Sequence, residues 1–337
     1  MHFDVCCVGQ MCTDVFLSPV NDVPERGHMS LVERATQSIG GCALNTAIGI
    51  STLGLRVALL GKVGDDGFGT FLKETLQKTG VNVDAIRQVK GAQSSMSVGL
   101  IDADGERTLL HCPGTNATLV YDDIDLGYLF RSRFMFIGGA LALDRFDGRD
   151  AARLLSTARL MGIKTAMDSS WDSTGQWMKN ISPCLPHLDW FMPSLEEAEQ
   201  MLGTRDPEAL AAQFMEGGAR NVVIKMGTKG AYVRPKDGEP FYVGIYQVAA
   251  VNAAGAGDAW CAGFIAGLVK GLDVREAAQL AAGNAALCVS AMGTTEGIRS
   301  FDATVAFIRS APYVQPGKYP LDMREYQPVV TRQEGET

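Results

Sequence analysis

The sequence predicts an α/β fold, in which a mainly parallel β-sheet lies between two layers of helices and a small β-sheet forms a lid. Short, continuous apolar runs recur along the chain, and each is followed by a segment long enough for a helix. Continuous apolar runs are typical of strands buried on both faces, and repeated strand–helix units place such strands parallel in one sheet. Ligands then bind beyond the carboxyl ends of the strands.

Six buried strands are predicted for the large sheet, at 3–9, 56–64, 133–139, 163–168, 188–193 and 221–227. Two polar, turn-rich stretches interrupt this order, at 13–38 and 93–112, the second with a hairpin turn at 102–106. These two stretches are predicted to pair as the lid. Residues 1–312 form one domain in this interpretation, and the Pro-rich, polar segment 313–337 forms a C-terminal extension on the surface.

The charge distribution favours a small-molecule partner. The net charge is −8 and there is no run of Lys or Arg, which argues against binding to nucleic acid or to an anionic membrane. The eight cysteines are scattered without a paired zinc-binding spacing, so we expect buried thiols in a reducing compartment. With neither a signal-like start nor an apolar run of about 20 residues, the expected location is the cytoplasm.

Asp258 stands at the start of a long run of small and apolar residues. A strand-like run is predicted at 246–251, the segment Gly255, Ala256 and Gly257 stands between this run and Asp258, and a helix is predicted to begin at about Gly257. Free N–H groups at such a helix start bind anions, above all phosphate. A carboxylate there would repel phosphate unless it removes a proton from an attacking hydroxyl. The alternative is an ordinary acidic residue that stabilises the helix dipole. The segment lacks the third glycine of a dinucleotide-binding loop.

A second segment, 40–69, carries a possible polyol site. Gly40 and Gly41 open a predicted helix, and Asn45 falls within its first turns. An amide can donate to and accept from a hydroxyl at the same time, which suits a sugar. The alternative is a glycine turn followed by an asparagine that faces solvent.

Together the two segments resemble the signatures of the ribokinase-like (PfkB) carbohydrate kinases. The amino-terminal signature matches at Gly40, Gly41, Asn45, Ala47, Gly54 and Gly64, and the carboxy-terminal signature matches at GAGD, about two hundred residues later. The resemblance implies a ribokinase-like three-layer αβα sandwich with a β-sheet lid. It also implies ATP-dependent transfer of a phosphoryl group to a hydroxyl of a sugar or nucleoside.

The resemblance further implies roles for individual residues. Asp258 would be the general base, and Gly255, Ala256 and Gly257 would form the anion hole for the transferring phosphoryl group. Asp14 would hold substrate hydroxyls, together with Gly40, Gly41 and Asn45.

The resemblance also implies a nucleotide site. The segment KMGTKG matches a nucleotide-binding hairpin of the family, which places Lys225, Gly227 and Gly230 near ATP and Asn284 by the adenine. Glu197 would hold Mg²⁺ through water, which is reasonable because Mg²⁺ keeps much of its hydration shell.

An alternative explains Glu197 without metal, and two departures from the family pattern bear on cations. Ser194 and Glu197 have the spacing of a helix capping box, and Ser194 stands where the family usually has Asn. Asn252, Ala253 and Ala254 replace the usual D-T-T or D-T-N, some of whose residues form a monovalent-cation site in related kinases. Activation by a monovalent cation is therefore an open question.

The expected substrate is an unphosphorylated sugar, namely a hexose, a ketohexose or a pentose. Family members that act on phosphorylated sugars tend to carry Lys after the two glycines, and GGCALN has none. Arg26, Arg34 and Arg107, in the lid segments, could meet an anionic group or could simply face solvent.

Two alternative functions stay open. A nucleoside kinase of the same fold would need an aromatic-lined lid, for which only Phe16 and Met29 are at hand, and a non-catalytic sugar-binding relative would have no need of an intact GAGD. In many relatives two lids pair, which makes a homodimer through the lid an expectation.

Overall fold

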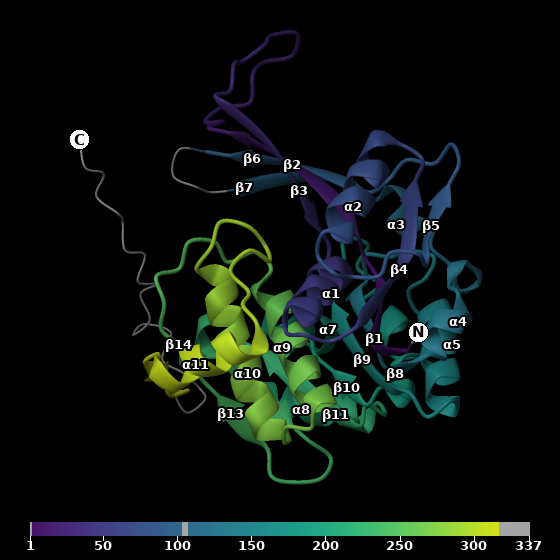
Figure 1. Ribbon diagram of the computed structural model, residues 1–337, viewed down its shortest axis with the longest axis vertical. Coiled ribbons are helices and arrows are strands. Elements are labelled where there is room, and N and C mark those ends of the chain that lie inside the picture. The colour runs from purple at the N-terminus through teal and green to yellow at the C-terminus, as the bar shows by residue number, and fades with distance from the viewer. Residues whose placement is uncertain (1, 103–106, 317–337) are drawn as a thin grey trace.

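The computed structural model describes residues 2–102 and 107–316, and its elements are labelled in Figure 1. The centre of the predicted hairpin turn, 103–106, and most of the predicted extension, 317–337, lie outside the described residues.

Within the described residues, the large sheet has nine strands in the order β13-β12-β11-β10-β9-β8-β1-β4-β5. Its strands are β1 (Phe3–Gly9), β4 (Val57–Gly64), β5 (Ile86–Val89), β8 (Ser132–Ala140), β9 (Lys164–Ser169), β10 (Trp190–Phe191), β11 (Asn221–Lys225), β12 (Ala231–Arg234) and β13 (Phe241–Val243). From β11 to β5 all neighbours pair parallel, and β12 and β13 add antiparallel. The predicted α/β fold is confirmed.

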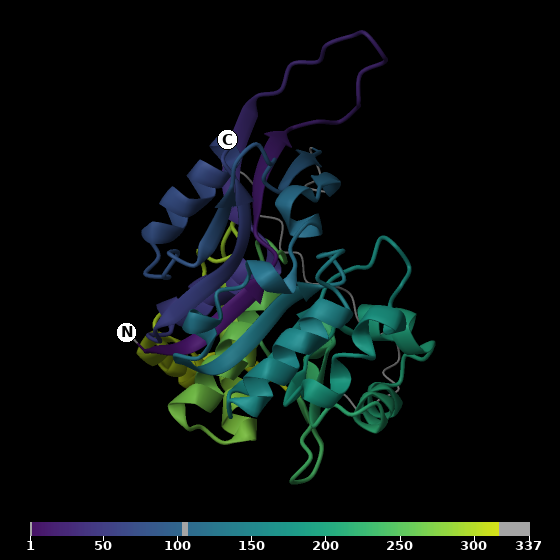
Figure 2. The same cartoon turned by 90° about the vertical axis from the view of Figure 1, so that its right-hand side faces the viewer.

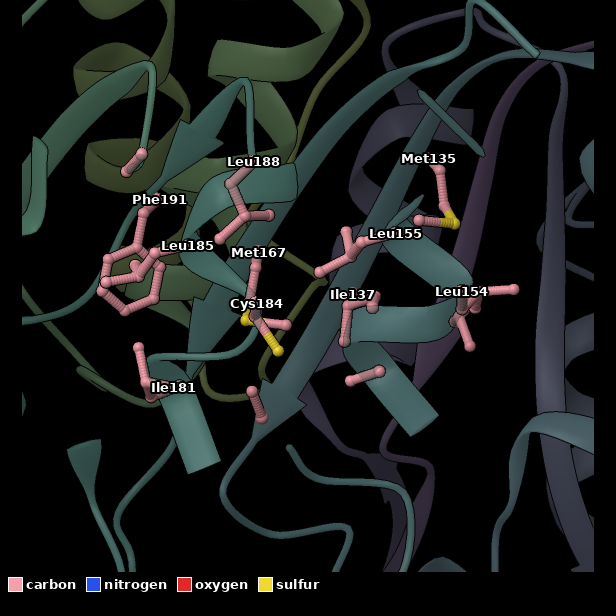
Figure 3. Packing of buried hydrophobic residues seen from close by; sticks show 14 of the residues in the cluster. Met135, Ile137, Leu154, Leu155, Met167, Ile181, Cys184, Leu185, Leu188 and Phe191 are labelled. Carbon is pink, nitrogen blue, oxygen red and sulfur yellow. The ribbon is translucent and has the colours of Figure 1, made fainter. Parts of the chain in front are cut away.

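Successive residues of the central strands point to opposite faces of the sheet and enter two different cores. In β1, Cys6 and Val8 join one core, while Val5 and Cys7 join the other. The first core packs against α4 (Leu126–Leu129), α5 (Arg149–Leu160), α6 (Met178–Ile181), α7 (Leu195–Leu202) and α8 (Pro207–Glu216), and part of it is drawn in Figure 3. The second packs against α1 (Cys42–Thr52), α2 (Gly67–Gln77), α9 (Ala256–Lys270) and α10 (Val274–Val289), with α11 (Phe301–Ser310) outside α10. Burial on both faces explains the continuous apolar strands.

The lid is a separate four-stranded sheet in the order β3-β2-β6-β7, which projects from one end of the large domain (Figures 1 and 2). Its strands are β2 (Cys12–Ser18), β3 (Arg34–Gly40), β6 (Met96–Ile101) and β7 (Arg107–Cys112). They come from the two stretches predicted to form it. Residues 19–33, between β2 and β3, contain no strand, and 21–33 are exposed.

Short elements complete the described chain. They are α3 (Gly114–Ala117), the 3₁₀ turns η1 (Tyr121–Asp123), η2 (Leu185–His187) and η3 (Gly227–Lys229), and the pair β14 (Ile245–Tyr246) and β15 (Tyr313–Val314). A strand-like run predicted at 246–251 ends at Tyr246 instead, and the following residues run without regular structure to α9. No helix among the described residues is long and apolar enough to cross a membrane.

The topology brings the predicted site residues to one end of the sheet. The chain runs outward from β1 through β4 to β5, then returns to β8 on the other side of β1. This reversal is a switch point, where α/β sheets leave a crevice for ligands. Here the N–H of Gln10, after β1, donates to the carbonyl of Gly138 in β8 at 3.0 Å. The first lid strand, β2, begins two residues later, so the lid leaves the large sheet at this switch point.

Candidate active site

The start of α9 is shaped by Gly255. This residue is the N-cap, with φ of 80°, and a Cβ at this position would lie 2.3 Å from the carbonyl oxygen of Thr294. Only glycine suits such a site. The first amides of a helix have no partner within the helix. Here the N–H of Ala256 donates to the Ala253 carbonyl at 3.3 Å, so the N–H groups of Gly257 and Asp258 are the donors that the first turn can offer to a ligand.

Asp258 is held by donors from a distant helix. The Nδ2 of Asn45, in α1, donates to Oδ2 of Asp258 at 2.8 Å, and Oγ1 of Thr46 donates to the backbone carbonyl of Asp258 at 3.4 Å. The orientation of Asn45 is set in turn by Thr294, whose Oγ1 donates to Oδ1 of Asn45 at 3.1 Å. This chain of donors requires the Asn45 amide to present its nitrogen to the carboxylate.

Burial controls the proton affinity of Asp258, which is only 8% exposed. Burial raises the pKa of Asp258 above its ordinary value, while the hydrogen bond from Asn45 and the charge of Lys225 act against that rise. A raised pKa makes a carboxylate a stronger base, provided that it is still ionised at the working pH.

Asp14 lies directly over Gly40, where β2 and β3 leave the large domain. A Cβ on Gly40 would lie 2.2 Å from Oδ2 of Asp14, and a Cβ on Gly41 would lie 2.6 Å from the carbonyl oxygen of Gln10. Gly41 also has φ of 103° and is the N-cap of α1. The two glycines therefore let the Asp14 carboxylate and the start of α1 approach each other. Asn45 lies in the first turn of the same helix, where it contacts Asp258.

Lys225 is paired with an acid that the sequence reading did not include. Its Nζ lies 2.6 Å from Oδ2 of Asp168, at the end of β9, and 3.8 Å from Sγ of Cys261 in α9. Burial lowers the pKa of Lys225, but the neighbouring charge of Asp168 outweighs it and raises the pKa, so the ammonium stays charged. Burial raises the pKa of Asp168 to about 7, although Lys225 acts to lower it. The sequence did carry a signal for Asp168, because this polar residue directly follows an apolar run, at the carboxyl end of a predicted strand where ligands bind.

Glu197 lies at the same edge of the sheet. The capping box is formed, since Oε2 of Glu197 accepts from the N–H of Ser194 at 3.0 Å while Oγ of Ser194 accepts from the N–H of Glu197 at 3.3 Å. Ser169, next to Asp168, also donates to Oε2 of Glu197 at 2.8 Å. No group of three or more His, Cys, Asp or Glu side chains forms a direct metal cage within 2–102 and 107–316. Isolated carboxylate oxygens instead fit a hydrated Mg²⁺.

The other residues predicted to lie near ATP differ in accessibility. Gly227 and Gly230 bound the turn η3, both with positive φ, and a Cβ on Gly230 would lie 2.0 Å from the carbonyl oxygen of Val243. Asn284 is 0% exposed, and its Nδ2 donates to the carbonyl of Ala259 at 2.7 Å, between α10 and α9. No atom of the Asn284 side chain is thus accessible to an adenine in this arrangement, because the packed helix pair encloses it.

The loop before α9 is closed by Asn252. Its Oδ1 accepts from the N–H of Ala254 at 2.9 Å, and its Nδ2 donates to the carbonyl of Met292. Both polar atoms of the Asn252 side chain therefore bond the backbone at positions 254 and 292.

The chain is similar to known proteins of one family. The pattern of the pfkB family carbohydrate kinases matches residues 2–300. The chain is 26% identical over 306 residues to the 2-dehydro-3-deoxygluconokinase of Bacillus subtilis (87% of this chain, 94% of the relative). It is 28% identical over 320 residues to the 5-dehydro-2-deoxygluconokinase of Clostridium perfringens (91% and 93%). Among solved structures, a putative ribokinase II from E. coli in complex with ATP and Mg²⁺ superposes with a TM-score of 0.79 at 21% identity (91% and 99%).

Proposed function

From the premise that this chain belongs to the pfkB family of carbohydrate kinases and is an ATP-dependent sugar kinase, we propose that it phosphorylates a hydroxyl of an unphosphorylated sugar with Asp258 as general base. The observation that carries the proposal is the hydrogen bond from Asn45, in α1, to Asp258 at the start of α9. Asn45 contacts Asp258 directly, and the helix that carries Asn45 begins at the glycine pair over which Asp14 lies.

In this mechanism Asp258 accepts the proton of the acceptor hydroxyl. As the proton moves to the carboxylate, the hydroxyl oxygen forms a bond to the γ-phosphorus of ATP and the bond from that phosphorus to the β-phosphate oxygen breaks, which releases ADP. Asn45 holds the carboxylate in position by its 2.8 Å hydrogen bond to Oδ2. General-base help of this kind contributes about 10²–10⁴-fold, and positioning supplies much of the rest.

The start of α9 supplies the electrostatic part of the mechanism. Negative charge on the transferring phosphoryl oxygens would be met by the amides of Gly257 and Asp258 and by the positive end of the helix dipole. Mg²⁺, held through water by Glu197, would neutralise phosphate charge when bound. The lid would exclude water, which would otherwise hydrolyse ATP.

The substrate we favour is a six-carbon keto sugar or a six-carbon keto sugar acid. No cation follows the glycine pair, since Cys42 and Ala43 occupy those positions, so the second phosphate of a phosphorylated sugar would have no partner there. Both curated relatives named above are dehydro-deoxygluconokinases. Arg26 and Arg34 are exposed in the lid segments and are available to a carboxylate once the lid closes.

A screen of acceptors tests the proposal. ADP release is measured with ATP and Mg²⁺ against pentoses, hexoses, ketohexoses, 2-dehydro-3-deoxygluconate, 5-dehydro-2-deoxygluconate and nucleosides, with Asp258→Asn as control. We expect turnover with a sugar or sugar acid, and a loss of about 10²-fold or more in the variant. Turnover with nucleosides alone, or a fully active Asp258→Asn, would overturn the proposal.

We also propose that two copies pair through their lids. The strands β3 and β7 are the edges of the lid sheet among the described residues, and Leu109 and Leu110 on β7 are exposed. Edge strands with exposed apolar side chains favour pairing with another strand. Light scattering should give a dimer mass for the wild type and a monomer mass for Leu110→Lys.

A further inference from the structure

The loop 290–300, between α10 and α11, lies against two parts of the candidate active site. Its residue Thr294 packs on the N-cap of α9, because a Cβ on Gly255 would lie 2.3 Å from the carbonyl oxygen of Thr294 and 2.9 Å from its Cα and Cβ. The hydroxyl of the same residue reaches α1, where Oγ1 donates to Oδ1 of Asn45 at 3.1 Å. One residue therefore contacts both the predicted anion hole and the donor that bonds Asp258.

Further contacts fix the backbone of this loop. The Sγ of Cys288, in the last turn of α10, donates to the carbonyl of Thr294 at 3.1 Å. Two residues earlier in the loop, the carbonyl of Met292 accepts from the Nδ2 of Asn252, which precedes the anion hole. The loop is thus held by α10 on one side and by the start of α9 on the other, so the half-buried Thr294 hydroxyl has a set position relative to both.

The Asn45 amide depends on this hydroxyl because its two ends are unlike. The Nδ2 end donates to the Asp258 carboxylate at 2.8 Å, whereas the Oδ1 end would be repelled by the same carboxylate. Asn45 is only 4% exposed, so an Oδ1 without a donor would be an unsatisfied buried acceptor. The amide would then rotate toward another donor and weaken its bond to Asp258. The Thr294 hydroxyl removes this conflict by donating to Oδ1.

We propose that Thr294 is a positioning residue for phosphoryl transfer, which acts through Asn45 to hold the Asp258 carboxylate in line with the anion hole at Gly255. This inference rests on the proposed function, in which Asp258 is the general base, and deepens it. None of the sequence patterns pointed to Thr294, because it lies beyond both signature segments and joins the site only through the fold.

Thr294→Val tests the hydroxyl, since valine keeps the branched shape of threonine but cannot donate a hydrogen bond. With Oδ1 of Asn45 left without this donor, we expect kcat to fall about fivefold to a hundredfold. KM for ATP should be unchanged, because the substitution acts on the base. Thr294→Ser restores the hydroxyl and should recover most of kcat. A Thr294→Val enzyme with the kcat of the wild type would overturn the proposal.

The pH profile of kcat separates positioning from a general loss of activity. Burial raises the pKa of Asp258, and hydrogen-bonding or charged side chains act on it from α1, β11 and α7, namely Asn45, Lys225, Cys42 and Glu197. Thr294→Val weakens the contribution of Asn45, which lowers the pKa, so the pKa of Asp258 should rise and the acidic limb should move to higher pH. A fall in kcat with the limb in its original place would assign Thr294 a structural role only.

A double-mutant cycle shows whether Thr294 acts through Asn45. Residues that act through one contact have strongly non-additive effects. Thr294→Val should therefore have its full effect in the wild type and little further effect in an Asn45→Ala background. Additive losses of kcat in the double variant would contradict the proposed route.

Thr304 is the matched control, because it is fully buried and its Oγ1 donates to the carbonyl of Ser300 at 3.0 Å, in α11. Thr304→Val should lower the melting temperature and leave both kcat and its pH profile unchanged. An equal shift of the acidic limb in Thr304→Val would show that the shift is not specific to Thr294, and would contradict the proposal. If Thr294→Val does not fold, Thr294→Ala removes the same hydroxyl and carries the same expectations.

The failure of this inference is distinct from that of the proposed function. A fully active Asp258→Asn contradicts the proposed function itself. An inactive Asp258→Asn, together with a wild-type kcat and pH profile for Thr294→Val, contradicts only the role of Thr294.

Discussion

Asn45 donates a 2.8 Å hydrogen bond to Asp258, although 213 residues separate the two in the chain. The bond joins the helix that follows the glycine pair to the helix that follows the anion hole. In the proposed mechanism this contact would couple sugar recognition to proton removal, because a shift of α1 would move both the glycine pair and the donor that orients Asp258.

The pH dependence of turnover should report this bond. Asp258 must be ionised to accept a proton, so kcat falls as the pH drops through its pKa, and that acidic limb should lie above the ordinary range of aspartate because burial raises the pKa. The hydrogen bond from Asn45 lowers the pKa, so Asn45→Ala should raise it and move the acidic limb to higher pH. The measurement is the pH profile of kcat at saturating ATP and sugar.

Asn82→Ala is the matched control, since Asn82 donates a 2.8 Å hydrogen bond to Asp84 on the surface. It should leave the profile unchanged. An acidic limb that stays in place in Asn45→Ala would show that Asp258 is not the titrating base.

Gly40→Ala should weaken sugar binding more than catalysis. The added Cβ would lie 2.2 Å from Oδ2 of Asp14, which must move away, while the backbone of Gly40 needs no positive φ. Loss of a hydrogen bond to a charged group predicts an increase in KM for the sugar of about tenfold or more. Initial rates at varied sugar concentration measure it.

The control for this substitution is Gly67→Ala, at the first position of α2, where a Cβ would meet nothing within 4 Å. Its KM for the sugar should match the wild type. If Gly40→Ala behaves in the same way, Asp14 does not hold the sugar.

Glu197→Gln should raise the Mg²⁺ concentration needed for half-maximal activity. The amide oxygen of Gln can still accept from the N–H of Ser194, so the cap is retained, but the charge that would attract a hydrated cation is lost. Titration of activity with Mg²⁺ at fixed ATP is the measurement.

Glu276→Gln is the corresponding control, because Glu276 completes the capping box at the start of α10 with Asp273. An equal Mg²⁺ requirement in both variants would return Glu197 to the purely structural role of a helix cap.

Asn284→Ala should reduce stability and leave KM for ATP unchanged. The side chain is fully buried and bonds the carbonyl of Ala259, so truncation removes one hydrogen bond and opens a small cavity, at a cost of about 1–3 kcal/mol. Chemical denaturation and ATP kinetics on the same sample decide the matter. A raised KM for ATP at unchanged stability would place Asn284 at the adenine after all.

The local pattern of the sequence was sufficient for most of the fold. Continuous apolar runs predicted the buried strands β1, β4, β8, β9, β10 and β11, and the two polar stretches predicted the lid. The run at 246–251 was misread because apolar residues there, such as Val248, pack against the second core without strand pairing, so hydrophobicity alone was ambiguous.

The sequence by itself determined the candidate site residues: Asp258 with its glycines, the glycine pair with Asn45, and Lys225 in its hairpin. Only the tertiary structure decided which side chains meet, because hydrogen-bond partners depend on strand order and on the direction in which each side chain leaves its element. It paired Lys225 with Asp168 and turned Asn284 into the helix interface. A propensity acts over a few residues, whereas these contacts form across 57 and 25 positions, and packing alone selects them.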